Sequence, residues 1–195
     1  MRPLPQELMA LDPHPTGTDG ASSRRHDANA TLAAAMADND ERLRALAFHL
    51  LGSRDAMDDV LQEVYLKAHG RLTTFRGDSA LSTWLYRITY TTCVDRLRHQ
   101  GRMRPAPLEQ IEDALPRPAA VDDDLALRDQ LHRALRSLTP ERCAAVLLVL
   151  RDGHTYSEAA EILGVPIGTV ASRVAHGRRQ LIRELSLDNP GGELR

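Results

Sequence analysis

Residues 155–185 decide the fold of this chain, and they run TYSEAAEILGVPIGTVASRVAHGRRQLIREL. Thr155 with Glu158 three residues later is typical of a capping box, which begins a helix. Gly164 ends that helix, because glycine adopts the left-handed conformation of a helix C-terminus without strain. Pro166 stands where the next helix begins, a position at which its missing N–H costs nothing. The stretch therefore predicts a helix, a tight turn and a second, longer helix.

The second helix has two contrasting faces. Apolar side chains recur at helical spacing and are expected to be buried, at Ile167, Val170, Val174, Leu181, Ile182 and Leu185. Hydroxyls, an imidazole and cations share the other face, at Thr169, Ser172, Arg173, His176, Arg178 and Arg179. In a helix-turn-helix, the first turns of the second helix reach base edges while flanking cations bind phosphates. We therefore predict a DNA-binding surface, the alternative being a surface helical hairpin with solvated charges.

Length and composition narrow the class of protein. The chain has 195 residues and a net charge of −2, which allows one domain or two small ones. It has no apolar run of about 18 residues and no signal-peptide pattern, so we expect a cytoplasmic protein without membrane insertion. Cys93 and Cys143 stand outside any CxxC or Cys/His spacing and are predicted to be reduced core residues. No metal site and no cofactor are expected.

Apolar periodicity elsewhere predicts an all-α fold of two small helical bundles joined by a flexible linker. Residues 1–27 are rich in Pro, Gly, Ser, Thr and Asp, as disordered tails are. Helical signal begins near Ala28, recurs over about 40–51, and returns in a helix capped by Asp78 or Ser79 that runs to about His99. The expected order is a tail (1–27), a first bundle (28–100), an acidic Pro-containing linker (101–123), a second bundle with the helix-turn-helix (124–187) and a tail (188–195).

The helix within residues 53–70 carries an unusual concentration of acids. Its polar face holds Asp55, Asp58, Asp59, Gln62 and Glu63. Four carboxylates within about two turns repel one another by a few tenths of a kcal/mol per pair. A solvated helix exterior is one interpretation. A basic partner surface, which would relieve the repulsion, is the other.

Several stretches resemble one family. The segments DDVLQEVYLKA (58–68), FRGDSALSTWLYRI (75–88) and VDRLR (94–98) are similar to region 2 of extracytoplasmic-function (ECF) sigma factors. The segment LTPERCAAVLLVLRDGHTYSEAAEILGVPIGTVASRV (138–174) is similar to their region 4. The match covers roughly residues 40–186 in the family's order. It implies an alternative sigma factor that binds bacterial core RNA polymerase, recognises −10 and −35 promoter elements and promotes strand opening.

The resemblance also implies a role for each surface. In the family, the acidic face of the 53–70 helix docks on the β′ clamp. The FRGDSA loop captures a flipped −10 base and the following helix lies against the melted strand, which implies −10 contacts from Phe75, Arg76, Asp78, Ser79, Arg87, Thr91, Arg96 and Arg98. Extruding a base costs a few kcal/mol, which a pocket and cations must offset. The C-terminal hairpin reads the −35 element and touches the β flap, and the resemblance implies an anti-sigma factor as a further partner.

Two helices depart from the family's pattern. Thr91 stands where Asn is usual, and a hydroxyl cannot make the bidentate contact of an amide. In the recognition helix, Ala171 replaces the usual cation, and His176 stands where Arg is common. Gly177 lowers helix propensity by up to about 1 kcal/mol relative to Ala. We therefore expect this helix alone to bind the −35 element weakly.

Two other classes of protein were weighed against this interpretation. A stand-alone helix-turn-helix regulator explains residues 155–185 but leaves the acidic helix and the second DNA-facing helix without a role. An enzyme is not expected, because the sequence has no phosphate-binding glycine loop, no metal-ligand set and no nucleophile with a placed base. A regulator would bind duplex DNA unaided, whereas a sigma factor needs core polymerase.

Overall fold

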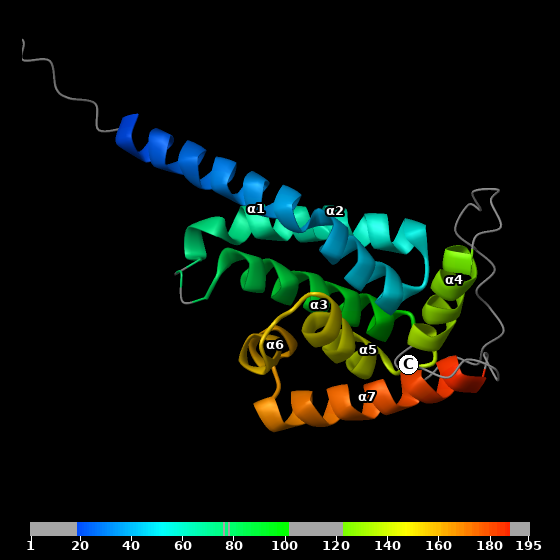
Figure 1. Cartoon of the computed structure of the whole chain (residues 1–195). Helices are drawn as coiled ribbons and strands as arrows, with labels where there is room; N and C mark the ends of the chain where they lie inside the picture. The colour runs from blue at the N-terminus through cyan, green and yellow to red at the C-terminus, as the bar shows by residue number, and fades with distance from the viewer. Residues whose placement is uncertain (1–18, 76, 78, 102–122, 188–195) are drawn as a thin grey trace, which may run out of the picture.

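The structure is a computed structural model that describes residues 19–75, 77, 79–101 and 123–187. Every regular element in these ranges is helical, which confirms the all-α prediction. The elements are α1 (Asp19–Leu51), α2 (Arg54–Arg71), the 3₁₀ turn η1 (Leu72–Thr74), α3 (Leu81–His99), α4 (Asp123–Arg136), α5 (Pro140–Val146), the π-helical turn η2 (Leu147–Arg151), α6 (Tyr156–Leu163) and α7 (Ile167–Leu187) (Figure 1).

Helices α1, α2 and α3 form the first bundle. Gly52, at φ 72°, ends α1, and the hydroxyl of Ser53 then accepts a hydrogen bond from the Ala56 amide to begin α2. The apolar faces of the three helices meet in residues that are fully buried, among them Leu46, Val64 and Leu85. Burial of these stripes holds the bundle together, because helices of this length gain most of their stability from packing.

Helix α1 corrects the predicted N-terminal boundary. The sequence predicts a disordered tail over 1–27 and two helical stretches after it, whereas the structure has one 33-residue helix from Asp19 to Leu51. No proline or glycine interrupts residues 21–51, and the alanine-rich middle has high helix propensity, so nothing stops the helix between the two stretches. The first part of the predicted tail, residues 1–18, lies outside the described residues.

The start of α3 is also corrected. Its N-cap is Ala80, which makes no side-chain capping bond, so the predicted cap at Ser79 is wrong. The other predicted cap, Asp78, lies outside the described residues. The helix nevertheless ends at His99 as predicted.

Helices α4 to α7 form the second bundle. The capping box that begins α6 is confirmed: the Thr155 amide donates to Glu158 Oε2 at 2.8 Å, and the Glu158 amide donates to Thr155 Oγ1 at 3.2 Å. Gly164 ends α6 at φ 65°, in the left-handed region, as predicted. Local sequence therefore sets the turn that orients α7.

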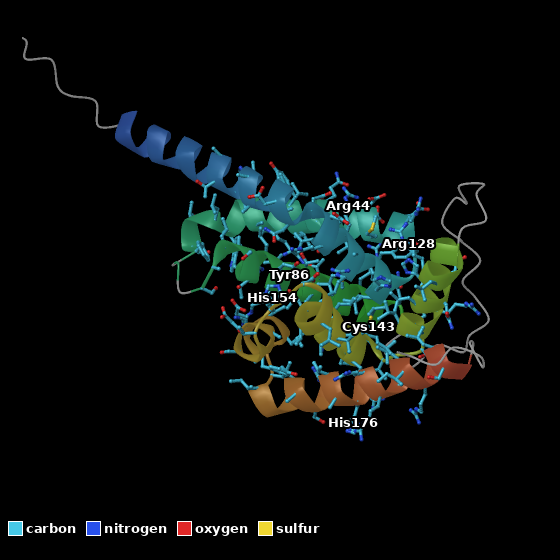
Figure 2. All side chains as sticks on the ribbon, in the orientation of Figure 1. Arg44, Tyr86, Arg128, Cys143, His154 and His176 are labelled. Atoms are coloured by element: carbon cyan, nitrogen blue, oxygen red, sulfur yellow. The ribbon has the colours of Figure 1, made fainter. Side chains whose placement is uncertain are left out.

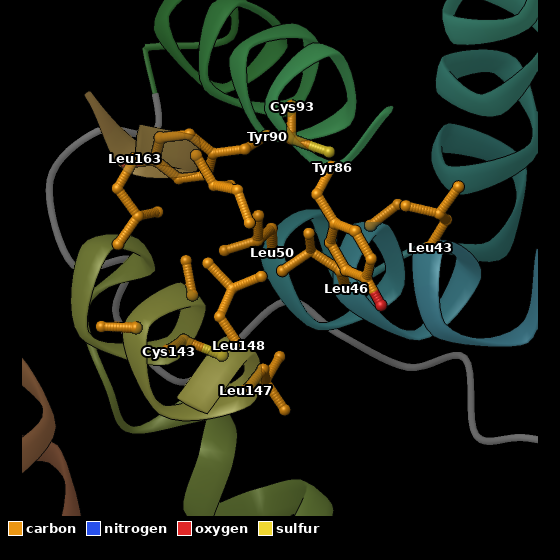
Figure 3. Close-up of a cluster of buried hydrophobic side chains, with 14 of the residues drawn as sticks. Leu43, Leu46, Leu50, Tyr86, Tyr90, Cys93, Cys143, Leu147, Leu148 and Leu163 are labelled. Carbon is orange, nitrogen blue, oxygen red and sulfur yellow. The ribbon is translucent and has the colours of Figure 1, made fainter. Parts of the chain in front are cut away.

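The two bundles pack against each other in one structure. Helix α3 lies against α6 and α1 lies against α5, with α7 on the far side of the second bundle (Figure 1). One cluster of buried side chains spans the junction (Figure 3), drawn from α1 (Leu43, Leu46, Leu50), α3 (Tyr86, Tyr90, Cys93) and the second bundle (Cys143, Leu147, Leu148, Leu163). Both cysteines are free and buried, as predicted. We call this packed form the closed arrangement.

Candidate nucleic-acid and polymerase interface

Helix α7 buries a narrower stripe than its sequence predicts. Val170, Val174 and Leu181 are buried, in agreement with the pattern. Ile167 and Ile182 were expected in the core but remain 52% and 46% exposed. Both therefore lie outside the buried stripe of α7.

The opposite face of α7 presents most of the predicted −35 residues to solvent. Ser172, His176, Arg178 and Arg179 are exposed, and His176 projects from the outer side of the helix (Figure 2). Arg179 Nη2 lies 3.0 Å from His176 Nδ1, which places a donor pair on one turn. Thr169 is half-buried near the helix start. This face can offer hydrogen bonds to base edges and charge to phosphates.

Arg173 is placed differently from its neighbours. The side chain is half-buried, and its Nη1 atom is buried with no hydrogen-bond partner among the residues that the structure describes. Its charge acts on Tyr90 of α3: burial raises the pKa of Tyr90, and the nearby Arg173 guanidinium opposes that rise. In the closed arrangement Arg173 therefore faces the first bundle, at the edge of a cleft lined by Thr139, Glu141, Arg142, Ser172, Arg173 and His176.

The packing roles of two residues that hold α7 in place were not predicted from the sequence. A Cβ on Gly177 would lie 2.6 Å from Val146 Cγ2, so the missing side chain lets α7 approach α5 closely. Gln180 Nε2 donates to the Ser137 carbonyl at 2.8 Å and so ties α7 to the end of α4. A glycine inside an amphipathic helix is the available sequence signal for close packing, although by propensity alone Gly177 indicates only a weaker helix.

The predicted −10 residues on α3 divide into exposed and half-buried groups. Arg87, Thr91 and Arg98 are exposed, and Arg96 is half-buried. The Thr91 hydroxyl lies 2.8 Å from the Arg87 carbonyl and 3.0 Å from the Ile88 carbonyl, so its proton is used within the helix. For a ligand, Thr91 then offers acceptor lone pairs only.

The loop before α3 is described in part. Phe75 is half-buried, and its ring lies 5.2 Å from that of Trp84, tilted by 48°. Ser79 is half-buried, while Arg76 and Asp78 lie outside the described residues. The Phe75–Trp84 pair is an aromatic surface at the end of the first bundle, of the kind on which a base can stack.

Arg87 faces the second bundle across a cleft. The cleft lies between α3 and the turn of the helix-turn-helix, and it is lined by Arg87, Ser157, Ala160, Glu161, Gly164, Val165, Pro166 and Ile167. Arg87 and Arg173 therefore both lie between the bundles.

The acidic face of α2 has partners within the chain. Its five predicted residues, Asp55, Asp58, Asp59, Gln62 and Glu63, are all exposed. Asp58 pairs with Arg44 of α1 at 2.7 Å, Asp59 with Arg96 of α3 at 2.8 Å, and Glu63 with Lys67 at 2.7 Å. These cations of the same chain relieve the repulsion between the carboxylates, for which the sequence suggested a basic partner. A partner can still replace them, because an exposed ion pair stabilises a protein by only about 0–1 kcal/mol.

Neither a metal site nor a membrane span is found in the described part of the chain. In the ranges that the structure describes, no three His, Cys, Asp or Glu side chains gather closely enough to hold a metal ion. None of the described helices combines the length and apolar composition that crossing a membrane demands.

Comparisons with known proteins bear on these surfaces. The profile of Sigma-70 region 2 matches residues 36–103, and that of Sigma-70 region 4 matches residues 128–181. The ECF RNA polymerase sigma factor SigM of Mycobacterium tuberculosis is 41% identical over 143 residues, covering 73% of this chain and 70% of the relative. The ECF RNA polymerase sigma-E factor of Escherichia coli is 36% identical over 134 residues, 63% of this chain and 70% of the relative.

Solved structures share the arrangement as well as the elements. The sigma factor RpoE of Bartonella quintana, in complex with the anti-sigma factor NepR, aligns with a TM-score of 0.66 at 27% identity, covering 84% of this chain and 99% of that one. CnrH, in complex with the cytosolic domain of CnrY, has the same fold, with a TM-score of 0.64 at 20% identity over 87% of this chain and 96% of that one. By sequence and by fold, the chain belongs to the ECF family of RNA polymerase sigma factors.

Proposed function

We propose that this chain joins core RNA polymerase, directs it to promoters with −10 and −35 elements, and assists strand opening, with no chemistry of its own. One observation carries the proposal: three polar surfaces lie on three separate helices, an acidic face on α2 and the candidate DNA-binding sets, both rich in arginine, on α3 and α7. A stand-alone regulator needs α7 but has no use for the other two surfaces. The site of action would be the cytoplasm, with the polymerase.

Helix α7 is assigned to the −35 element. Its N-terminal turns carry Thr169, Ser172 and Arg173, which are placed for base edges, and His176, Arg178 and Arg179 follow as candidates for bases and phosphates. The exposed face supports this assignment, and Arg173 would have to turn away from Tyr90 to take part.

Helix α3 and the loop before it are assigned to the −10 element. The Phe75–Trp84 pair offers a stacking surface for an extruded base. Arg87, Arg96 and Arg98 would hold the phosphates of the melted strand, with Thr91 accepting a hydrogen bond. Ser79, with Arg76 and Asp78, completes the proposed loop contacts.

The acidic face of α2 is assigned to the polymerase. On binding, a basic partner surface would replace Arg44 and Arg96 beside Asp58 and Asp59. Exchange of one exposed ion pair for another costs little, so the internal pairs do not oppose docking. Asp55, Gln62 and Glu63 would extend the contact. A protein of the anti-sigma class, such as the one bound to RpoE, is the proposed regulator.

Core binding by charge-reversed variants tests the polymerase assignment. Asp58→Lys/Asp59→Lys is expected to abolish co-purification with core polymerase, because two cations would then face a basic surface. Asp38→Lys/Glu41→Lys makes the same change in net charge at exposed positions of α1 and is expected to bind normally. Arg44→Gln removes the internal partner of Asp58 but keeps the acid, so it is expected to bind at least as well as wild type.

Retained binding by Asp58→Lys/Asp59→Lys would remove α2 from the polymerase surface. Loss of binding in Arg44→Gln as well would show that the ion pair supports the fold rather than the contact. Far-UV circular dichroism of each variant separates the two cases.

A further inference from the structure

Two histidines stack between α1 of the first bundle and α4 of the second. The rings of His49 and His132 lie 5.0 Å apart with their planes 26° from parallel. Phe48 packs beside the two histidines, with its ring edge-on to that of His132 and the ring centroids 6.2 Å apart. His132 Nδ1 is buried, and among the described residues it has no hydrogen-bond partner. The contact therefore consists of ring faces, and a proton on that nitrogen would lack an acceptor in the described part of the chain.

The charged groups around this pair are mostly cations. Arg136 of α4 and Arg151 of η2 face His49, and Arg136 and Arg128 face His132. The acid that acts on His132 is Asp129. Burial, reinforced by these cations, lowers the pKa of His49 to about 4, and burial likewise lowers the pKa of His132. A proton on either ring would be a poorly hydrated charge among like charges.

A third histidine at the junction provides a contrast. His154 meets the ring of Tyr86 edge-on at 4.6 Å. It faces Glu158 and Asp152 as well as Arg42, so acids partly compensate a charge on it, although burial still lowers its pKa. Its Nδ1 lies 4.0 Å from a Glu158 oxygen. Protonation there disturbs the junction less than protonation of the His49–His132 stack.

The closed arrangement covers part of the proposed DNA surface. Arg87 of α3 lines the cleft against the helix-turn-helix, and Arg173 of α7 has a buried guanidinium nitrogen facing the first bundle. Arg87 is exposed and only borders that cleft, whereas the buried nitrogen of Arg173 is not free for a nucleic-acid backbone while the bundles are packed. Presenting Arg173 to DNA requires the bundles to move apart, which the chain between residues 101 and 123 permits by its length.

We infer that the His49–His132 stack is an acid-sensitive latch, which holds the two bundles closed at neutral pH and releases them when the rings are protonated. The opening is argued from the ring stack and the charges around it and does not depend on what the protein binds. The consequence of opening, the release of Arg173 to DNA, rests on the proposed function.

The direction and size of the pH effect follow from thermodynamic linkage between protonation of the rings and opening of the bundles. The pKa of His49 is lower in the closed form than its ordinary value of 6.5, so the closed form is fully favoured above that pH and weakens as the pH falls toward 4. If the open form has the ordinary value, the open-to-closed ratio rises about tenfold at pH 5.5 from His49 alone. His132 adds to this in the same direction.

The buried thiols report opening without an added label. Cys93 on α3 and Cys143 on α5 are 0% and 1% exposed and both lie in the cluster that spans the junction. The rate of their reaction with 4,4′-dithiodipyridine, divided by the rate in the urea-unfolded chain at the same pH, gives the accessible fraction. Hydrogen exchange of the helix amides is measured in parallel, because opening exposes thiols and leaves helices protected, whereas unfolding exposes both.

The expected result is a rise of at least about tenfold in thiol accessibility between pH 7.5 and 5.5, with the helix amides still protected. His49→Phe/His132→Phe keeps two stacked rings without a titrating nitrogen and is expected to respond less than threefold. His69→Gln, at an exposed histidine of α2, is expected to respond as wild type does. His49→Arg places a permanent cation in the stack and is expected to be open already at pH 7.5.

A flat response in wild type, or an equal rise in the double-Phe variant, would overturn the latch. So would loss of amide protection in step with the thiols. Since the measurement uses the chain alone, its outcome is separate from that of polymerase binding. If the bundles open at low pH but the chain does not bind polymerase, the inferred latch is supported and only the proposed function is contradicted.

Discussion

At the scale of single residues, the packing of α7 depends on the missing side chain of Gly177. Gly177 has no Cβ, and the space that a Cβ would need is taken by Val146 of α5. Valine is stiff at χ1, and Val146 is 4% exposed, so it has little freedom to yield. The position therefore fixes how closely α7 lies on the rest of its bundle.

Gly177→Ala is expected to destabilise the protein by up to about 2 kcal/mol, because an overpacking cost of about 1–3 kcal/mol outweighs the gain of up to about 1 kcal/mol in helix propensity. Urea unfolding measures the difference. Gly168→Ala is the matched control: a Cβ there meets nothing within 4 Å, so the propensity gain should appear alone. If both variants are stabilised equally, the close approach is not a constraint.

Arg173 carries the corresponding prediction for DNA. Arg173→Ala is expected to weaken promoter binding by the polymerase complex by about 1–3 kcal/mol and to relax the preference at one −35 position. If Arg173 holds a phosphate instead, the slope of the logarithm of the binding constant against the logarithm of the salt concentration falls in magnitude by about one, and the preference for base sequence does not change. Binding curves at several salt concentrations distinguish these results, with the exposed Arg183→Ala as control. Unchanged binding would remove Arg173 from the −35 surface.

At the scale of elements, α6 shows how local chemistry positions the reading helix. The Thr155 amide and hydroxyl both hydrogen-bond Glu158, and these bonds lower the pKa of Glu158 below its ordinary value of 4.5. The stabilisation is therefore present above about pH 4.5 and is lost as the pH falls through the lowered value.

Removing the cap is expected to cost about 1 kcal/mol at pH 7, measured as the free energy of unfolding of Thr155→Ala. Glu158→Gln keeps an acceptor but not the charge, so its deficit relative to wild type should shrink as the pH is lowered below 4.5. A deficit that is independent of pH would mean that the carboxylate charge contributes nothing to the cap.

The same elements show what sequence can and cannot predict. The capping box and Gly164 were predictable because each acts within four residues. The start of α1 was not, since composition alone made residues 19–27 resemble a tail. The inward position of Arg173 and the internal partners of Asp58 and Asp59 depend on helices that are distant in sequence, and no local pattern records them.

At the scale of the whole molecule, the two bundles share a core. Besides the apolar cluster, Arg151 of η2 donates to the Arg42 carbonyl of α1 at 2.9 Å, which joins positions 109 residues apart. The sequence predicts two modules joined by a linker but not their packing. A shared core makes the stability of one bundle depend on the other.

Leu148→Ala tests this dependence. Leu148 is fully buried in the second bundle, at the junction, and its truncation is expected to cost about 2–5 kcal/mol. Trp84 is the single tryptophan and lies in the first bundle, so its fluorescence follows that bundle. The account predicts that the Trp84 unfolding transition moves to lower denaturant together with the far-UV signal. A Trp84 transition unchanged by the mutation would show that the bundles unfold independently.

Transcription in a purified system tests the central claim most directly. The full chain is mixed with bacterial core RNA polymerase and a library of promoter-bearing fragments from the source genome, and run-off RNA is mapped at its 5′ ends. The account predicts transcripts that depend on the chain and begin at a fixed distance from shared −10 and −35 sequences. If the chain neither binds the core enzyme nor initiates RNA from any fragment, its role as a sigma factor is contradicted.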